Sequence, residues 1–141
     1  MRVCVIDGRG GGLGRLLVEG LHDSLGRSHD IVALGTNAVA AQAMREAGAS
    51  YVGIGSHAIA QTVPTADVIV ASLNMVLPGA MLGEVTQEIA RTILEAKAKK
   101  VLLPLNRIQI EIVGTGGRTM EKLIDECLSR VRAAAQTTCR A

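Results

Sequence analysis

Short apolar runs along the chain alternate with segments in which apolar residues recur every three or four positions. The runs lie at residues 2–7, 31–35, 51–54, 67–73 and 100–105, and they are rich in Val, Ile and Leu. Such runs predict strands. Because most of them are continuously apolar rather than alternating, they indicate parallel strands that are covered on both faces.

Periodic segments between these runs predict helices. The predicted helices span about residues 13–25, 38–47, 57–63, 79–97 and 118–135. Asn37 precedes the second helix and is suited to cap it, and Gly48 ends it. In the fourth helix we expect Leu82, Val85 and Ile89 to face inward.

A sixth strand is expected at residues 108–113, where Ile108, Ile110 and Ile112 alternate with Gln109 and Glu111. Only two residues separate this segment from the preceding run. A parallel return needs a crossover of about a dozen residues or more, so this strand should pair antiparallel.

The order of these elements predicts an α/β fold with a doubly wound, mostly parallel sheet of the Rossmann-like kind. The last antiparallel strand and a C-terminal helix complete it. We expect a single domain over residues 1–135 and a frayed tail over 136–141, because no linker or repeat interrupts the 141 residues.

The segment "VIDGRGGGLGR" joins the first strand to the first helix and holds five glycines. A helix start offers unpaired N–H groups, and glycines let a phosphate approach the backbone. The glycines of this loop match neither the G-x-G-x-x-G spacing of dinucleotide-binding loops nor the Walker pattern of phosphate-binding loops. Gly8-x-x-x-Gly12-x-Gly14 resembles the loop of the short-chain dehydrogenases. The predicted cradle comprises Gly8, Arg9, Gly10, Gly11, Gly12, Leu13 and Gly14; the alternative is a flexible turn.

NAD or NADP is the cofactor that this loop suggests, but two features expected of a dehydrogenase are missing. Thr36 and Asn37 stand at the end of the second strand, where an acidic residue normally binds the adenosine ribose of NAD. The Tyr-x-x-x-Lys pair is also absent, since Gly55 follows Tyr51 at four residues. The chain is therefore expected to bind a nucleotide without a reaction that we can assign.

Other polar residues are expected beside this loop, because the carboxyl ends of parallel strands share one edge of the sheet. They are Asp7, Thr36, Asn37, Ser72, Asn74, Asn106 and Arg107. Arg9 and Arg107 are candidates for contact with an anion. Each residue has a structural alternative: Asn37 as a helix cap, Asp7 as a partner of loop amides, and Asn106 and Arg107 as turn residues.

No catalytic residue can be assigned. Glu84 and Glu111 are the carboxylates considered for acid–base work, and His57 follows the third strand closely enough to reach a ligand. A glutamate early in a predicted helix, as Glu84 is here, more often serves as a favourable charge at the helix N-terminus. No Ser/His/Asp arrangement and no metal-spaced cluster is present, so we expect no metal.

The composition of the chain argues against nucleic acid and membranes as partners. The chain is 48% hydrophobic and 20% charged with a net charge of +2, and it has one Tyr but neither Phe nor Trp. Nucleic acid is not expected as a partner, since basic clusters and aromatic platforms are lacking. A membrane span is not expected, because Asn74 and Pro78 interrupt the longest apolar stretch. Three widely spaced cysteines favour a reducing cytoplasm.

The stretch "LNMVLPGAML", residues 73–82, is apolar around a Pro-Gly turn. Exposed apolar surface of this kind either folds over a ligand as a lid or is buried against a second subunit. We expect a homodimer that uses this loop, strand 108–113 or the last helix.

Segments such as "VIDGRGGGLG", "ALGTNA" and "LPLNR" together resemble a family of small bacterial proteins, a domain-of-unknown-function family with a Rossmann-like fold. The resemblance implies the fold and a nucleotide-type ligand, and it supplies no reaction. A nucleotide or dinucleotide binder is thus the first hypothesis. A regulatory ligand-sensing or assembly domain is the second, and an enzyme acting on a phosphate-bearing metabolite with Arg107 and Glu84 is the third.

Overall fold

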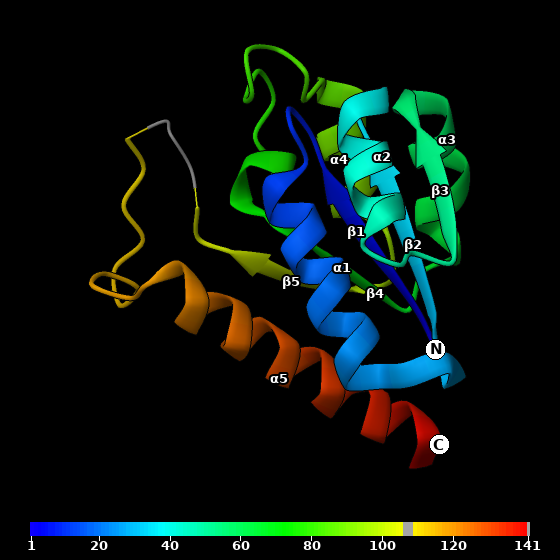
Figure 1. Ribbon diagram of the computed structural model, residues 1–141. Helices are drawn as coiled ribbons and strands as arrows, with labels where there is room; N and C mark the ends of the chain where they lie inside the picture. The colour runs from blue at the N-terminus through cyan, green and yellow to red at the C-terminus, as the bar shows by residue number, and fades with distance from the viewer. Residues whose placement is uncertain (106–108, 141) are drawn as a thin grey trace.

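The computed structural model describes residues 1–105 and 109–140, and only the backbone of 138–140. Within this part of the chain, five parallel strands form one sheet in the order β3-β2-β1-β4-β5 (Figure 1). The strands are β1 Arg2–Asp7, β2 Asp30–Gly35, β3 Tyr51–Ile54, β4 Val68–Ser72 and β5 Lys99–Leu103. The five apolar runs of the sequence therefore form the predicted parallel sheet.

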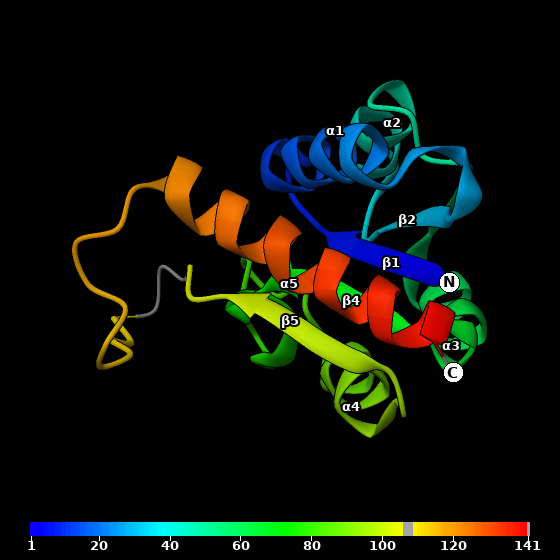
Figure 2. The ribbon, with the colours of Figure 1, turned by 90° about the horizontal axis from the view of Figure 1, so that it is seen from below.

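Helices cover both faces of this sheet. They are α1 Gly12–Leu25, α2 Ala38–Glu46, α3 Gly55–Thr62, α4 Gln87–Glu95 and α5 Met120–Arg140. One face packs against α1, α2 and α5, and the other against α3 and α4 (Figure 2). The doubly wound α/β fold is confirmed. The last helix continues to Arg140, through residues where the sequence predicts a frayed tail.

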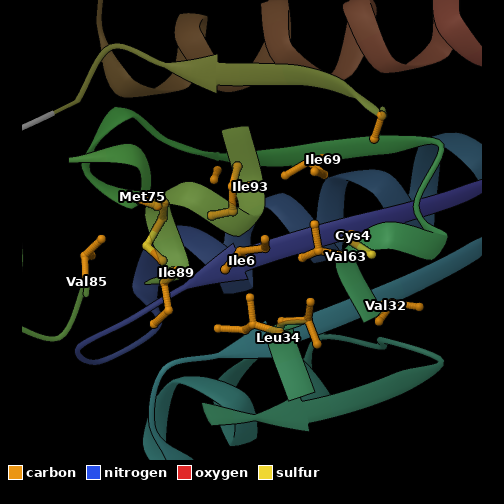
Figure 3. Packing of buried hydrophobic residues seen from close by; sticks show 14 of the residues in the cluster. Cys4, Ile6, Val32, Leu34, Val63, Ile69, Met75, Val85, Ile89 and Ile93 are labelled. Carbon is orange, nitrogen blue, oxygen red and sulfur yellow. The ribbon is translucent and has the colours of Figure 1, made fainter. Parts of the chain in front are cut away.

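The central strand β1 contributes side chains to two separate cores. Val3 and Val5 pack with α1 and α5, whereas Cys4 and Ile6 pack with α3 and α4 (Figure 3). All four are fully buried, and burying a large apolar side chain is worth about 1.5–3 kcal/mol. The loop at the end of β1 is thus attached to a strand that both cores hold in place.

The predicted antiparallel strand at 108–113 is not found. Residues 109–113 form no strand, and Ile108 lies outside the described residues. Gln109 has a φ of 42°, which is incompatible with extended backbone, and Val113 is 96% exposed. The segment runs beyond the end of β5 instead of folding back along it (Figures 1 and 2).

The fourth helix starts later than the sequence predicts. Met81 and Leu82 have φ values of 55° and 56°, so residues 77–86 form turns instead of helix. Leu82 is 90% exposed, which contradicts its predicted inward position. The helix begins after Thr86, whose Oγ1 accepts a hydrogen bond from the N–H of Ile89 at 3.2 Å. We call residues 77–86 the covering loop.

Candidate functional site

The loop between β1 and α1 lies at the carboxyl edge of the sheet, between the ends of β2 and β4. Strands β2 and β4 both pair with β1, one on each side, because the winding of the sheet changes direction there. In open α/β sheets, ligands bind in the crevice at this switch point. The fold therefore places the glycine loop where the sequence pattern predicts a ligand.

Asp7 holds the glycine loop in shape. Its buried carboxylate accepts hydrogen bonds from the N–H of Gly8 at 2.8 Å and from the N–H of Gly14 at 2.7 Å. Burial raises the pKa of Asp7 and outweighs the opposing effect of these two hydrogen bonds. The interpretation of Asp7 as a partner of loop amides is confirmed.

Three of the five glycines are required by packing. A Cβ on Gly8 would lie 2.7 Å from the Oγ1 of Thr36, and one on Gly14 would lie 2.6 Å from the Sδ of Met44. Gly11 has a φ of 72°, and a Cβ there would meet the backbone of Ala40. These three positions bring the loop close to its neighbours.

Gly10 and Gly12 have no such constraint, because a Cβ on either would meet no atom within 4 Å. Both line a pocket together with Leu13. Among the described residues, the N–H groups of Gly10, Gly12 and Leu13 have no hydrogen-bond partner. The start of α1 thus presents unpaired donors at the pocket, as anion sites at helix N-termini do.

The pocket has a volume of about 500 Å³, within the range of small-molecule sites. Its lining comes from the β1–α1 loop, the end of β4, the covering loop and the two ends of the β5–α5 connection. The lining residues are Asp7, Gly8, Arg9, Gly10, Gly11, Gly12, Leu13, Ser72, Asn74, Gly79, Ala80, Met81, Leu82, Leu105 and Met120.

Ser72, the last residue of β4, is 3% exposed, and its Oγ has no hydrogen-bond partner among the described residues. A buried hydroxyl without a partner costs free energy unless something pairs with it. Because Ser72 lines the pocket, its unpaired hydroxyl suits a ligand that brings a polar group to this position. Asn74, two residues further, lines the same pocket.

Thr36 and Asn37 lie beside the glycine loop but are engaged by Glu84. The Oε1 of Glu84 accepts hydrogen bonds from the Oγ1 of Thr36 at 2.8 Å, the Nδ2 of Asn37 at 2.6 Å and the N–H of Arg9 at 3.2 Å. Burial raises the pKa of Glu84, but these hydrogen bonds outweigh it and leave the pKa below its ordinary value.

Asn37 also caps α2, since its Oδ1 accepts from the N–H of Ala40 at 2.9 Å, as the sequence predicts. Asn106 and Arg107 lie outside the described residues. His57 is exposed on α3, and Glu111 is exposed in the segment after β5. Neither lines the pocket.

Several apolar lining residues were not predicted as site residues, namely Ala80, Met81, Leu82, Leu105 and Met120. Three of them were indicated by the sequence, because the apolar stretch 73–82 is expected to form either a lid over a ligand or a subunit interface. Met120, the first residue of α5, is exposed beside the pocket.

No group of three or more His, Cys, Asp or Glu residues in the described part of the chain could hold a metal ion. The same part of the chain contains no helix that combines the length and apolar character needed to cross a membrane.

Comparison with protein families matches residues 2–136 to the family described as "Domain of unknown function (DUF3842)", so the chain belongs to that family. No curated protein matches the sequence. Among solved structures, the chain is similar to a dodecameric FMN-dependent Ubix-like decarboxylase from Escherichia coli O157:H7. The two share 14% identity with a TM-score of 0.53 over 93% of this chain and 92% of that chain. At this identity, the similarity shows the fold alone.

Proposed function

We propose that this member of the DUF3842 family binds a phosphate-bearing nucleotide in the pocket at the Gly8–Gly14 loop. The observation that carries the proposal is the convergence of unpaired donors on one pocket. The N–H groups of Gly10, Gly12 and Leu13 and the buried hydroxyl of Ser72 all belong to residues that line it.

Charge at the start of α1 also favours an anion. The first turn of α1 contains no acidic residue, so the partial positive charge of the helix N-terminus is not offset from within the helix. Arg9 lines the same pocket and offers a guanidinium for a phosphate. The carboxylate of Asp7 is directed to the N–H groups of Gly8 and Gly14, which leaves the other donors to the ligand.

The apolar part of the lining suits the ring of a nucleotide. The side chains of Ala80, Met81, Leu82, Leu105 and Met120 line the pocket alongside the polar groups. Ligand sites commonly combine an apolar wall with a few placed polar groups. A phosphate at the glycine loop and a ring against this wall are the binding mode that we propose.

Two sources suggest the kind of nucleotide. The spacing of the glycines favours NAD or NADP, and no residue of β2 supplies the acid that would select NAD, so little preference between the two is expected. The fold neighbour is FMN-dependent, which makes a flavin nucleotide the other candidate.

A regulatory ligand-sensing or assembly role is the second candidate function. It is favoured by the fact that Asp7 is the one carboxylate among the described lining residues, and Asp7 is bound to loop amides. A pocket whose one lining carboxylate is taken up by loop amides is suited to holding a ligand for sensing.

We also propose that the chain forms a homodimer and works in a reducing cytoplasm. Leu82 and Val113 are large apolar side chains that are almost fully exposed, and covering them in an assembly would remove that surface from water. The two cysteines whose side chains are described, Cys4 and Cys127, are free thiols in the core.

A thermal-shift screen with FMN, FAD, NAD, NADP, AMP, ATP and sugar phosphates tests the binding proposal. A ligand at a hundred times its dissociation constant stabilises the folded state by about 2.7 kcal/mol, which raises the melting temperature measurably. At least one nucleotide should produce such a shift, and a sugar phosphate should produce a smaller one. If no compound shifts the transition, the proposal is wrong.

A further inference from the structure

The end of β2 is covered by a side chain from another part of the chain. Glu84, in the covering loop, places its Oε1 within hydrogen-bond distance of both Thr36 and Asn37. Met81 of the same loop lies against Gly8, since a Cβ on that glycine would be 2.8 Å from the Sδ of Met81. The covering loop thus closes over the β2 side of the glycine loop.

This position matters because of how dinucleotides lie on doubly wound sheets. The pyrophosphate binds at the start of α1, and the adenosine ribose is bound at the end of β2 by an acidic acceptor. In this chain the polar groups at that point are already paired. Thr36 and the Nδ2 of Asn37 donate to Glu84, and the Oδ1 of Asn37 accepts from Ala40.

The covering loop keeps this arrangement through its own hydrogen bonds. The N–H of Gly79 donates to the carbonyl of Val85 at 2.7 Å, and the N–H of Glu84 donates to the carbonyl of Met81 at 3.1 Å. Val85 is fully buried, which anchors the loop to the core beside α4. Glu84 is therefore presented from a compact turn.

The pocket extends in the opposite direction. Its lining includes Ser72 and Asn74 at the end of β4, Leu105 after β5 and Met120 at the start of α5, and it includes no residue between 14 and 71. A ligand that places a phosphate at the glycine loop has room on the β4 side and is blocked on the β2 side.

We infer that Glu84 determines the class of ligand, restricting the site to a mononucleotide and excluding dinucleotides. Of the candidates proposed above, this leaves FMN or a nicotinamide mononucleotide and rules out NAD, NADP and FAD. The inference rests on the proposed function, since it presupposes that the glycine loop holds a phosphate. A mononucleotide would lay its ring toward Ser72 and the apolar wall. The adenosine half of a dinucleotide would have to displace Glu84 from Thr36 and Asn37.

FMN and FAD form a matched pair for the test, because FAD is FMN extended by an adenosine monophosphate unit. Calorimetric titration of each compound into the full chain gives the ratio of their dissociation constants. We expect wild-type protein to bind FMN at least about tenfold more tightly than FAD. In Glu84→Ala, which uncovers the end of β2, the ratio should fall to about threefold or less. Glu88→Ala, an exposed change in the first turn of α4, serves as the control and should keep the wild-type ratio.

Nicotinamide mononucleotide and NAD provide the same comparison if flavins do not bind. Wild-type protein that binds a dinucleotide as tightly as its mononucleotide overturns the inference and leaves the proposed function standing. An unchanged ratio in Glu84→Ala also overturns it. Should that variant fail to fold, Thr36→Val removes one donor to Glu84 and should lower the ratio in the same direction. AMP and NAD give the comparison if only adenine nucleotides bind. If wild-type protein binds none of these compounds and none of the thermal-shift screen, the proposed function itself fails.

Discussion

The Nδ2 atom of Asn37 lies 2.6 Å from the Oε1 atom of Glu84, although 47 positions separate the two residues along the chain. The same amide nitrogen donates to the carbonyl of Arg9 at 3.1 Å, and the amide oxygen caps α2. One side chain therefore joins the end of β2, the glycine loop and the covering loop. The geometry of the candidate site depends on this junction.

Stability should depend on pH through Glu84. Its pKa in the folded protein lies below the ordinary value of 4.5, so its contribution to stability is present above that pH and is lost as the pH falls through the folded pKa. We expect wild-type protein to melt at a higher temperature than Glu84→Ala at pH 7, and the difference to shrink below pH 4.5. Melting curves from pH 7 to pH 3 measure it.

Asp7 affects the pH dependence of stability in the opposite direction from Glu84. Its raised pKa means that ionisation of Asp7 opposes folding, a cost that appears as the pH rises above 3.8 and is relieved in acid. The charge of Glu84 adds to that shift. Glu84→Gln, which also removes the charge, controls for this coupling. A difference in melting temperature that is constant across the whole range would contradict our account.

Ser72→Ala should leave the unliganded protein as stable as wild type or make it more stable. The substitution removes a buried hydroxyl that has no described partner, and such a group costs about 1–3 kcal/mol. Nucleotide affinity should fall at the same time. Thermal melting and calorimetric titration measure the two effects, with the exposed Ser129→Ala as a control. A marked loss of stability without ligand would show that the hydroxyl serves the fold instead.

Gly12→Val should fold normally and lose nucleotide binding. A Cβ on Gly12 meets no atom of the protein within 4 Å, yet the side chain would stand where the unpaired N–H groups receive a phosphate. Gly116→Val is a matched control, because a Cβ there is equally unobstructed and Gly116 does not line the pocket. Circular dichroism verifies the fold and titration measures binding. A folded Gly12→Val that binds like wild type would rule out the phosphate cradle.

Light scattering at micromolar concentration tests the homodimer, which should have twice the mass of one 14.7 kDa chain. Leu82→Asp and Val113→Asp are suitable probes, because both side chains are exposed and neither supports the core. Met75 is fully buried, so substituting it would test folding instead of assembly. The variant that lowers the mass identifies the interface, and a mass of one chain for wild-type protein rules the dimer out.

The strands β1, β2 and β4 could be predicted because each is an apolar run that the parallel sheet buries on both faces. The edge strands β3 and β5 are only partly buried, but their apolar residues still form β-branched or aliphatic runs of strand length. The cap at Asn37 could be predicted from the residue type and its place before a periodic segment. The alternation at 108–113 was misleading, since alternating isoleucines also occur in an exposed segment, and the left-handed conformation of Gln109 leaves no signal in the pattern.

The position of Glu84 could not have been found from the sequence. Its place after an apolar stretch favoured a helix start, whereas the left-handed Met81 and Leu82 turn the chain and aim the carboxylate at the end of β2. The absence of an acid from the carboxyl end of β2, where Thr36 and Asn37 follow Gly35, could be read from the sequence. That an acid arrives there from the covering loop is a tertiary contact, which local patterns do not encode.

Nuclear magnetic resonance measures the central claim most directly, by titrating FMN and nicotinamide mononucleotide into ¹⁵N-labelled protein and following every backbone amide. Binding in the proposed mode should move the N–H signals of Gly10, Gly12 and Leu13 most, together with those of Ser72 and Asn74, and should leave Tyr51 in β3 unchanged. Signals that do not move at millimolar nucleotide, or that move only away from the glycine loop, would contradict a nucleotide site at this pocket.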